Sequence, residues 1–288
     1  MTSFTLLLVL TSAGFHVVTH VALKQSRDRS AFVWWMLIWA GVIFLPIPIL
    51  GWTSFPAIGW GLMAFSAVFE AGYFGAIALA YRGADLSLVY PLARGTAPVL
   101  LMLWSIIFLH ETLTPGGVLG ILMITLGLYT INLPKPGAWR EPLRSLSRVG
   151  PRWAVAAGFC TSAYTAIDKV GIGYVPPLLY TYLALWMSVV LLTPWTLWQV
   201  GGAGLRAEIK SSRGGTVLAG FTTLAAYGLV LLAMSFGMPA AYAGALREIS
   251  VVFGAAYGVL VLKEQGGPMR ILGAGFVALG AVLIGFLG

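Results

Sequence analysis

Two stretches of the 288-residue chain share one pattern: Leu109–Gly127, LHETLTPGGVLGILMITLG, and Leu262–Gly280, LKEQGGPMRILGAGFVALG. In each stretch a glutamate is followed by a proline four residues later, by Leu-Gly after four more, and by a second Leu-Gly at the end. The shared positions are offset by 153 residues throughout. Because both order and spacing are kept, the pattern predicts that the chain contains two copies of one unit.

Weaker matches upstream extend the duplication over most of the chain. They occur in the same order, with an offset of 153 or 154 residues in the middle of the unit and 144 near its start. Such order and spacing favour duplication over coincidence. The matches pair Ala71, Tyr73 and Gly83 with Ala225, Tyr227 and Gly237, Arg94 with Arg247, and Ala13–Phe15 with Ala157–Phe159.

The composition is that of a membrane protein. The chain is 59% hydrophobic and 9% charged, with a mean hydropathy of +0.91, and a water-soluble domain of this size could not bury so much apolar surface. The formal charge of +8 comes from basic residues that lie mostly in loops, so it indicates membrane orientation and not a nucleic-acid partner. Cys160 is the single cysteine, which excludes an internal disulfide and a cysteine-based metal site.

Segments of about 20 apolar residues, the length of one membrane crossing, predict an all-α integral membrane protein with ten transmembrane helices. The first segment lacks the basic start and small-residue cleavage site of a signal peptide, so we read it as a retained span. Residues 134–151 form the one long polar joint, which divides the chain into a first repeat, 1–133, and a second repeat, 152–288. The expected spans are 2–24, 31–51, 57–81, 86–109, 115–133, 152–171, 177–199, 214–236, 240–262 and 268–287.

The odd number of spans in each repeat makes the second copy enter the membrane from the opposite side. Inverted repeats of this kind place substrate sites near the bilayer midplane, between two halves that rock about them. Arg94 and Arg247 each lie about a third of the way along their spans, which run in opposite directions. The two guanidinium groups are therefore expected to face one central space.

The paired motifs closing each five-helix half resemble those of EamA-type members of the drug/metabolite transporter superfamily. The resemblance covers nearly the whole chain, and the short stretch Ala243–Arg247, AGALR, is also similar to a motif of nucleotide-sugar transporters. It implies transport of amino acids, drugs or other small metabolites, often outward, without a bound cofactor. No Walker sequence for ATP is present, so a gradient of substrate or protons would drive transport.

The distribution of basic residues predicts the orientation of the chain. Of the 17 lysines and arginines, 14 fall at the joints after odd-numbered spans, and the other three are Arg94, Lys169 and Arg247. The positive-inside rule then places both termini outside, although family members commonly have both in the cytoplasm. With the resemblance, this predicts a multi-pass protein of a bacterial-type inner membrane.

Six ionisable side chains are expected inside the membrane, where each costs roughly 3 kcal/mol or more unless it has a partner or a function. One interpretation is that they form ion pairs that fix helix packing. The other is a binding site, which a bend at Pro91 and Pro98 beside Arg94 would favour because proline frees backbone carbonyls. The six are His16, His20, Glu70, Arg94, Arg247 and Glu248.

Each candidate suits a particular chemistry. Arg94 and Arg247 can hold a carboxylate, phosphonate or phosphate group through their forked donors. Glu70 and Glu248 can bind a substrate amine, accept a coupling proton, or pair with an arginine. His16 and His20 share one helix face, which suits a pH-sensitive cavity wall, packing or a metal site, and no metal is expected.

Aromatic and glycine residues complete the sequence-based picture. Four deep aromatic side chains can stack on a substrate, lend hydroxyls, or pack. Glycines seven residues apart in spans five and ten, Gly120 with Gly127 and Gly273 with Gly280, predict close helix contact, within the chain or in a dimer. The aromatic candidates are Tyr73, Tyr90, Tyr227 and Trp186.

Two functions remain open from the sequence. The first is a secondary transporter of a small amphoteric or anionic metabolite such as an amino acid, with export implied by the resemblance and a proton gradient as one source of drive. The second is an intramembrane enzyme that acts on a lipid headgroup through His16, His20 and Glu70. The expected partners are the small-molecule substrate and the lipid bilayer, and the chain is expected to be a monomer or a homodimer.

Overall fold

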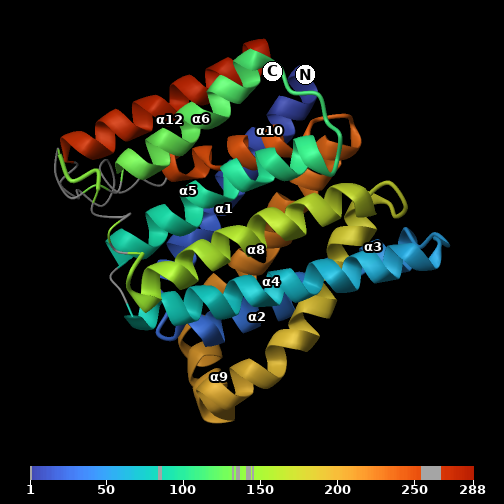
Figure 1. The fold of residues 1–288 in the computed structure, drawn as a ribbon. Helices are drawn as coiled ribbons and strands as arrows, with labels where there is room; N and C mark the ends of the chain where they lie inside the picture. Colours follow the sequence, from blue (N-terminus) through green and yellow to red (C-terminus); the bar gives the residue numbers. More distant parts are fainter. Residues whose placement is uncertain are drawn as a thin grey trace.

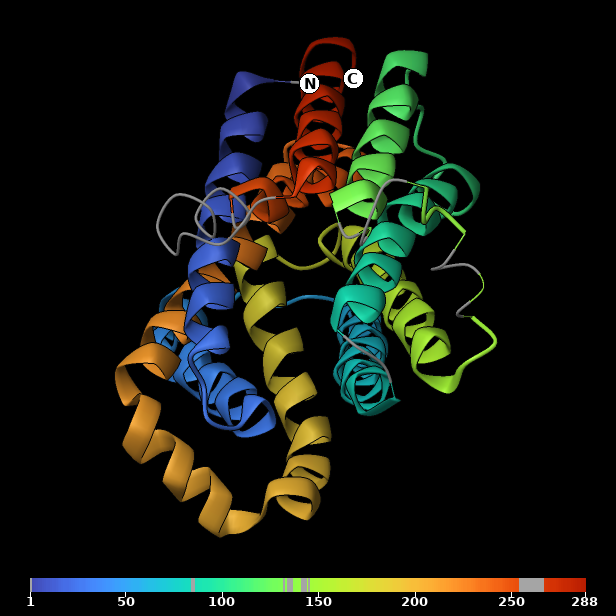
Figure 2. The same ribbon diagram turned by 90° about the vertical axis from the view of Figure 1, so that its left-hand side faces the viewer.

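The computed structural model describes residues 2–83, 86–131, 133, 137–140, 144, 146–253 and 267–288, and every regular element among them is a helix (Figure 1). Both termini lie at the same end of the molecule (Figure 2). The helices are α1 (Ser3–Lys24), α2 (Arg29–Ile43), α3 (Pro46–Leu50), α4 (Ala57–Gly83), α5 (Leu86–Ile107), α6 (Pro115–Ile131), α8 (Val149–Gly171), α9 (Pro177–Ser235), α10 (Ala240–Arg247) and α12 (Pro268–Leu287).

Local sequence signals set where several helices begin. The side chain of Thr2 accepts a hydrogen bond from the Thr5 amide at 3.3 Å, and Asp28 accepts one from the Ala31 amide at 2.9 Å. Each side chain satisfies an amide that has no partner within the helix. α6, α9 and α12 instead begin with proline, whose missing N–H and fixed φ suit the first helical position.

α9 contains two of the predicted segments joined by a turn region. Gly201 has φ of 69° and Ser212 has φ of −127°, so the helix is interrupted at both residues. The part between them bends at the end of the molecule opposite the termini (Figure 2). This agrees with the separate segments 177–199 and 214–236 that the sequence predicts.

Five of the described helical segments are long and apolar enough to cross a membrane. They begin at Ser3, Arg29, Ala57, Pro177 and Pro268. The chain is therefore a multi-pass helical membrane protein.

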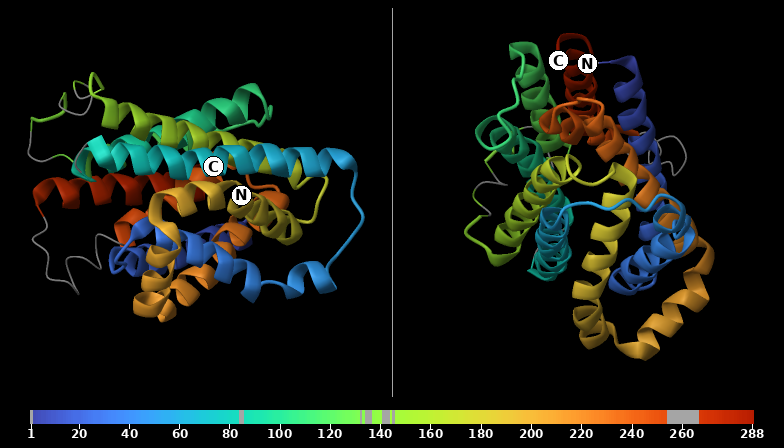
Figure 3. Two further views of the ribbon diagram at one scale, coloured as in Figure 1. Left: turned by 90° about the horizontal axis from the view of Figure 1, so that it is seen from below. Right: turned by 90° about the vertical axis from the view of Figure 1, so that its right-hand side faces the viewer.

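The helices form two neighbouring groups. α1 and α2 pack on α9, whereas α4 and α5 pack on α8, and contacts between α4 and α9 join the groups (Figure 3). α10 lies against α5 and α1. It ends at Arg247 with Glu248 as its cap, and residues 249–253 are helical again, so the predicted span 240–262 is interrupted at Glu248; residues 254–266 lie outside the described residues.

α6 and α12 lie side by side through the glycines that the sequence singles out (Figure 1). A Cβ added at Gly127 would lie 2.6 Å from the Gly273 carbonyl oxygen, and one added at Gly120 would lie 2.7 Å from that of Gly280. The backbones can approach this closely only because no side chain separates them. The prediction of close helix contact is confirmed, and the contact is made within the chain.

Replacing Gly127 with alanine is expected to lower the melting temperature in detergent, whereas Gly275→Ala is expected to leave it unchanged or raise it. Alanine favours a helix over glycine by about 1 kcal/mol, but overpacking costs about 1–3 kcal/mol. At Gly275 an added Cβ meets nothing within 4 Å, so only the helix preference acts there. Equal shifts for the two variants would contradict the close contact.

Candidate functional site

Arg94 joins three helices near the centre of the molecule. Its Nη1 donates to both carboxylate oxygens of Glu248, at 3.1 and 2.9 Å, and its Nη2 lies 2.8 Å from Nε2 of His20. Glu248 is only 1% exposed, so its charge has little contact with solvent. A buried carboxylate needs such a partner, and the ion-pair interpretation of Arg94 is therefore supported for this pair.

The contact with Arg94 also fixes the protonation of His20. A guanidinium has only donors, so Nε2 of His20 must accept, and its proton must lie on Nδ1. His20 is thus neutral in this arrangement. The neighbouring ring of His16 stacks at 6.4 Å, and its buried Nε2 has no hydrogen-bond partner within the described part of the chain.

Arg247 differs from Arg94 in its surroundings. It lies at the end of α10, is 6% exposed, and its Nε has no hydrogen-bond partner among the described residues. Its contact with Glu248 is long, 3.9 Å from Nε to Oε1, while both oxygens of that carboxylate accept from Arg94. The phenol groups of Tyr164 and Tyr227 lie within electrostatic range. A buried guanidinium with donor capacity to spare is suited to an anionic guest.

Asp168 belongs to the site, although it is not among the residues predicted from the sequence. It is 1% exposed and accepts from the hydroxyl of Tyr180 at 2.9 Å and from that of Tyr227, and Ser66 also lies beside it. Asp168 stands three residues before the expected end of its span, next to Lys169, and this position did not indicate a buried acid. Asp168 lies one helical turn after Tyr164 on the same helix face, and this spacing is the feature of the sequence that could have indicated its place in the site.

Glu70 has a hydroxyl partner and not the arginine partner that one interpretation predicted. Its Oε2 accepts from Ser188 of α9, and no lysine or arginine whose side chain the structure describes forms an ion pair with it. The side chain is partly exposed although it lies mid-helix. Tyr164 and Asp168 are both within electrostatic range of Glu70, which places this carboxyl on the α8 side of the site.

The other predicted site residues have different positions. Tyr73 interacts electrostatically with Tyr164 and packs edge-on against Phe74. The ring of Trp186 lies directly over Gly41 of α2, so it packs between α2 and α9. The side chain of Tyr90 lies outside the described residues, and α5 runs through Pro91 and Pro98 without interruption.

These side chains define what we call the polar cluster. It brings together residues of α1, α4, α5, α8, α9 and α10 with the cap that follows α10. Its described members include three carboxyl groups but two guanidinium groups. The members are His16, His20, Glu70, Arg94, Tyr164, Asp168, Tyr227, Arg247 and Glu248.

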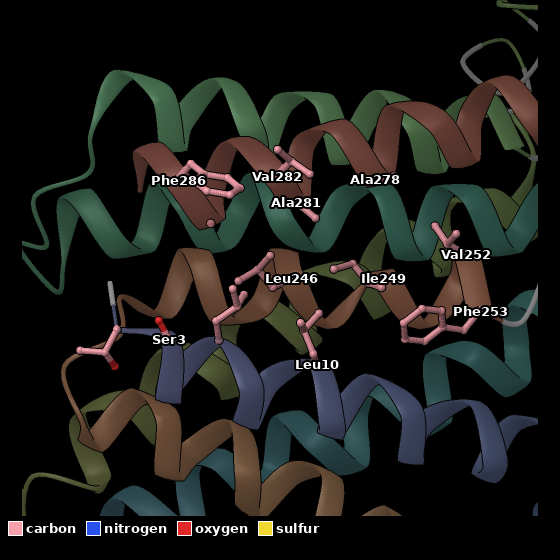
Figure 4. Close-up of a pocket in the computed structure, with 13 residues that line it drawn as sticks. Ser3, Leu10, Leu246, Ile249, Val252, Phe253, Ala278, Ala281, Val282 and Phe286 are labelled. Carbon is pink, nitrogen blue, oxygen red and sulfur yellow. The ribbon is translucent and has the colours of Figure 1, made fainter.

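Charged groups are absent from the described lining of a separate cavity of about 490 Å³ between α1, α10 and α12 (Figure 4). Leu246 and Ile249 line it, and they flank Arg247 and Glu248 in the sequence. The described residues also bring no three His, Cys, Asp or Glu side chains together as a metal site. The polar cluster is therefore the better candidate for a charged solute.

We expect Asp168 and Tyr180 to be energetically coupled. Asp168→Asn and Tyr180→Phe should each lower the melting temperature, because each leaves a buried polar group without its partner, at a cost of about 1–3 kcal/mol. The double variant should lose less than the sum of the two, as contacting residues do. Tyr182→Phe, another buried tyrosine of α9, serves as the control. Additive shifts would contradict the contact.

The apolar helices and their arrangement define the class, a multi-pass helical membrane protein. The chain belongs to the EamA-like transporter family, whose model matches residues 3–133 and 148–286. The resemblance found in the sequence is thus confirmed, and the protein is a membrane transporter of the drug/metabolite superfamily.

Comparison with solved structures supports the fold. One crystal structure, titled only as that of a protein, matches with a TM-score of 0.69 over 99% of this chain and 98% of that chain, at 16% sequence identity. At this identity the likeness shows the fold alone. No curated protein matches the chain.

Proposed function

We propose that the protein is a secondary transporter, working as an exporter, of a small amphoteric or anionic metabolite such as an amino acid. The solute is bound at the polar cluster and moved by alternating access. The observation that carries this proposal is Arg247, a buried guanidinium whose Nε has no hydrogen-bond partner among the described residues. A substrate carboxylate would supply the missing acceptor.

The substrate's two ends would bind different parts of the cluster. Arg247 receives the carboxylate, and Glu70, which has a hydroxyl partner but no cationic one in the described segments, receives the amine. Tyr164 is in electrostatic range of both residues, so the two charges share one neighbourhood. Arg94 acts indirectly, because it holds Glu248 and His20.

The charge balance of the cluster allows a proton to bind together with an amphoteric solute. Glu70, Asp168 and Glu248 outnumber Arg94 and Arg247 by one among the described members. The described members therefore carry one excess negative charge, which an ammonium group or a proton at Glu70 would balance. An amino acid brings a carboxylate together with its ammonium group, so one further positive charge is needed. Binding an amino acid together with one proton would therefore leave the cluster neutral, which links transport to a proton gradient.

The architecture proposed for this mechanism is ten spans in two inverted repeats, 1–133 and 152–288, joined by 134–151. Apart from α2, which ends at Ile43, and α10, which ends at Arg247, the described helices begin and end close to the predicted spans. The family model matches the chain in two separate parts. Two inverted halves enclosing one site are suited to alternating access. We further propose that both termini lie outside a bacterial-type inner membrane and that the unit is a monomer or homodimer.

Uptake and efflux in proteoliposomes test this proposal. The substrate panel comprises amino acids, the matching carboxylic acids without the amine, aminophosphonates and organic cations, each with and without a pH gradient. Amphoteric solutes should be transported best. Flux of cations alone would contradict the substrate class, and turnover of a lipid headgroup without solute flux would favour an enzyme using His16, His20 and Glu70.

A further inference from the structure

Glu111, the first residue of the repeated Glu-x3-Pro motif, binds the beginning of another helix. Its two carboxylate oxygens accept from the amide of Ala240, at 3.1 and 2.9 Å, and it also accepts from the hydroxyl of Ser105. Ala240 is the first residue of α10, whose N-terminal amides lack partners within the helix. The negative charge also suits the positive end of the helix dipole.

Lys169 makes the complementary contacts at the end of a neighbouring helix. Its Nζ donates to the carbonyl oxygens of Met234 at 2.8 Å and Met238 at 3.0 Å, where α9 ends, and lies 3.5 Å from Oε1 of Glu111. A cation at the C-terminal end of a helix is favoured by the dipole and by the free carbonyls. We call these contacts of Glu111 and Lys169 the latch.

The latch joins four parts of the chain at the end of the molecule that carries the termini. Glu111 precedes α6, Lys169 lies in α8, and the groups they bind end α9 and begin α10. α10 carries Arg247 seven residues beyond Ala240, about 10 Å along a helix. Through this short helix, the latch is mechanically connected to the polar cluster.

We propose that Glu111 and Lys169 are positioning residues of the transport cycle: the latch closes the terminus-bearing end and sets the position of Arg247. Opening of that end requires Glu111 to release the start of α10. This inference rests on the proposed alternating access, but it is independent of the identity of the substrate. By this inference, the first copy of the repeated Glu-x3-Pro motif acts at the terminus-bearing side of the membrane.

Accessibility of a single cysteine tests the latch without any substrate. Ser66→Cys in a Cys160→Ser background places the thiol at a buried position of α4 beside Asp168. A membrane-impermeant maleimide is added from the terminus-bearing side. Glu111→Ala and Lys169→Met should each raise the labelling rate about ten-fold, a typical effect of losing a helix cap, and Glu111→Gln, which keeps one acceptor, should raise it less.

Two comparisons make the result specific. Lys210→Met removes an exposed lysine from α9 and should leave labelling unchanged. Exchanging the charges, Glu111→Lys with Lys169→Glu, should not restore slow labelling, because each residue would then meet the wrong end of a helix. Restoration by the exchange would show that only the mutual ion pair matters, and unchanged labelling in Glu111→Ala and Lys169→Met would overturn the latch.

Transport assays on the same variants separate failure of this inference from failure of the proposed function. Release of the latch should change the maximal rate more than the KM, since Glu111 does not touch the substrate site, and Glu111→Gln should recover part of the rate. A changed KM alone would contradict a gating role. If labelling changes as expected while no amphoteric solute is transported, the latch stands and the substrate proposal fails.

Discussion

Replacement of Arg247 by alanine is expected to abolish most transport of carboxylate-bearing substrates while the protein remains folded. Removing one partner from a buried charged hydrogen bond costs about 2–5 kcal/mol, so transport at low substrate concentration should fall by at least about 30-fold. Folding should be largely kept because the ion pair of Arg247 with Glu248, the one that it forms among the described residues, is long at 3.9 Å. Initial rates in proteoliposomes, with size-exclusion profiles and melting temperatures, measure both effects.

The same substitution at Arg94 is the matched comparison. Arg94→Ala leaves Glu248 buried without its guanidinium partner, which costs about 3–5 kcal/mol of stability. We therefore expect a clear fall in melting temperature for Arg94→Ala and a smaller one for Arg247→Ala. Arg247→Lys should recover part of the transport, because a lysine keeps the charge but lacks the planar fork. Normal transport by Arg247→Ala would remove the basis of the substrate proposal.

The two arginines show which features could be predicted from the sequence and which could not. Helical segments and the glycine contact follow from hydropathy and spacing, which depend on neighbours along the chain. The repeat aligned Arg94 with Arg247 and thus suggested equal roles. Their environments differ because Glu248 is bound by Arg94, 154 residues away, and this choice of partner depends on side-chain geometry across helices.

Asp168 shows a second limit of the sequence. It lies near the expected end of its span beside Lys169 and is not among the predicted site residues, yet three hydroxyl groups from other helices surround its carboxyl group. The donors, Tyr180, Tyr227 and Ser66, are separated in the sequence and gave no periodic pattern with Asp168. Only tertiary packing brings them together, so burial of this acid could not be read from hydropathy.

The second large effect is expected at Glu70. Glu70→Gln should lower the preference for an amino acid over the same carboxylic acid without the amine by about 30-fold, because a neutral amide binds an ammonium group far more weakly than a carboxylate does. The acceptor for the Ser188 hydroxyl is kept, so the contact between α4 and α9 should persist. Competition between the two solutes in one proteoliposome preparation measures the ratio directly.

Glu208→Gln is the control for this charge change. Glu208 is a buried glutamate that accepts from the Asp28 amide at 2.8 Å, but it lies in the bend of α9 at the opposite end from the termini. Its replacement should leave the solute preference unchanged. The pH gradient separates the two roles of Glu70: loss of the amine preference identifies an ammonium ligand, whereas an unchanged preference with loss of gradient dependence identifies a proton carrier. If Glu70→Gln changes neither, the carboxyl group serves packing, and the charge balance of the cluster must be set by Asp168 and Glu248.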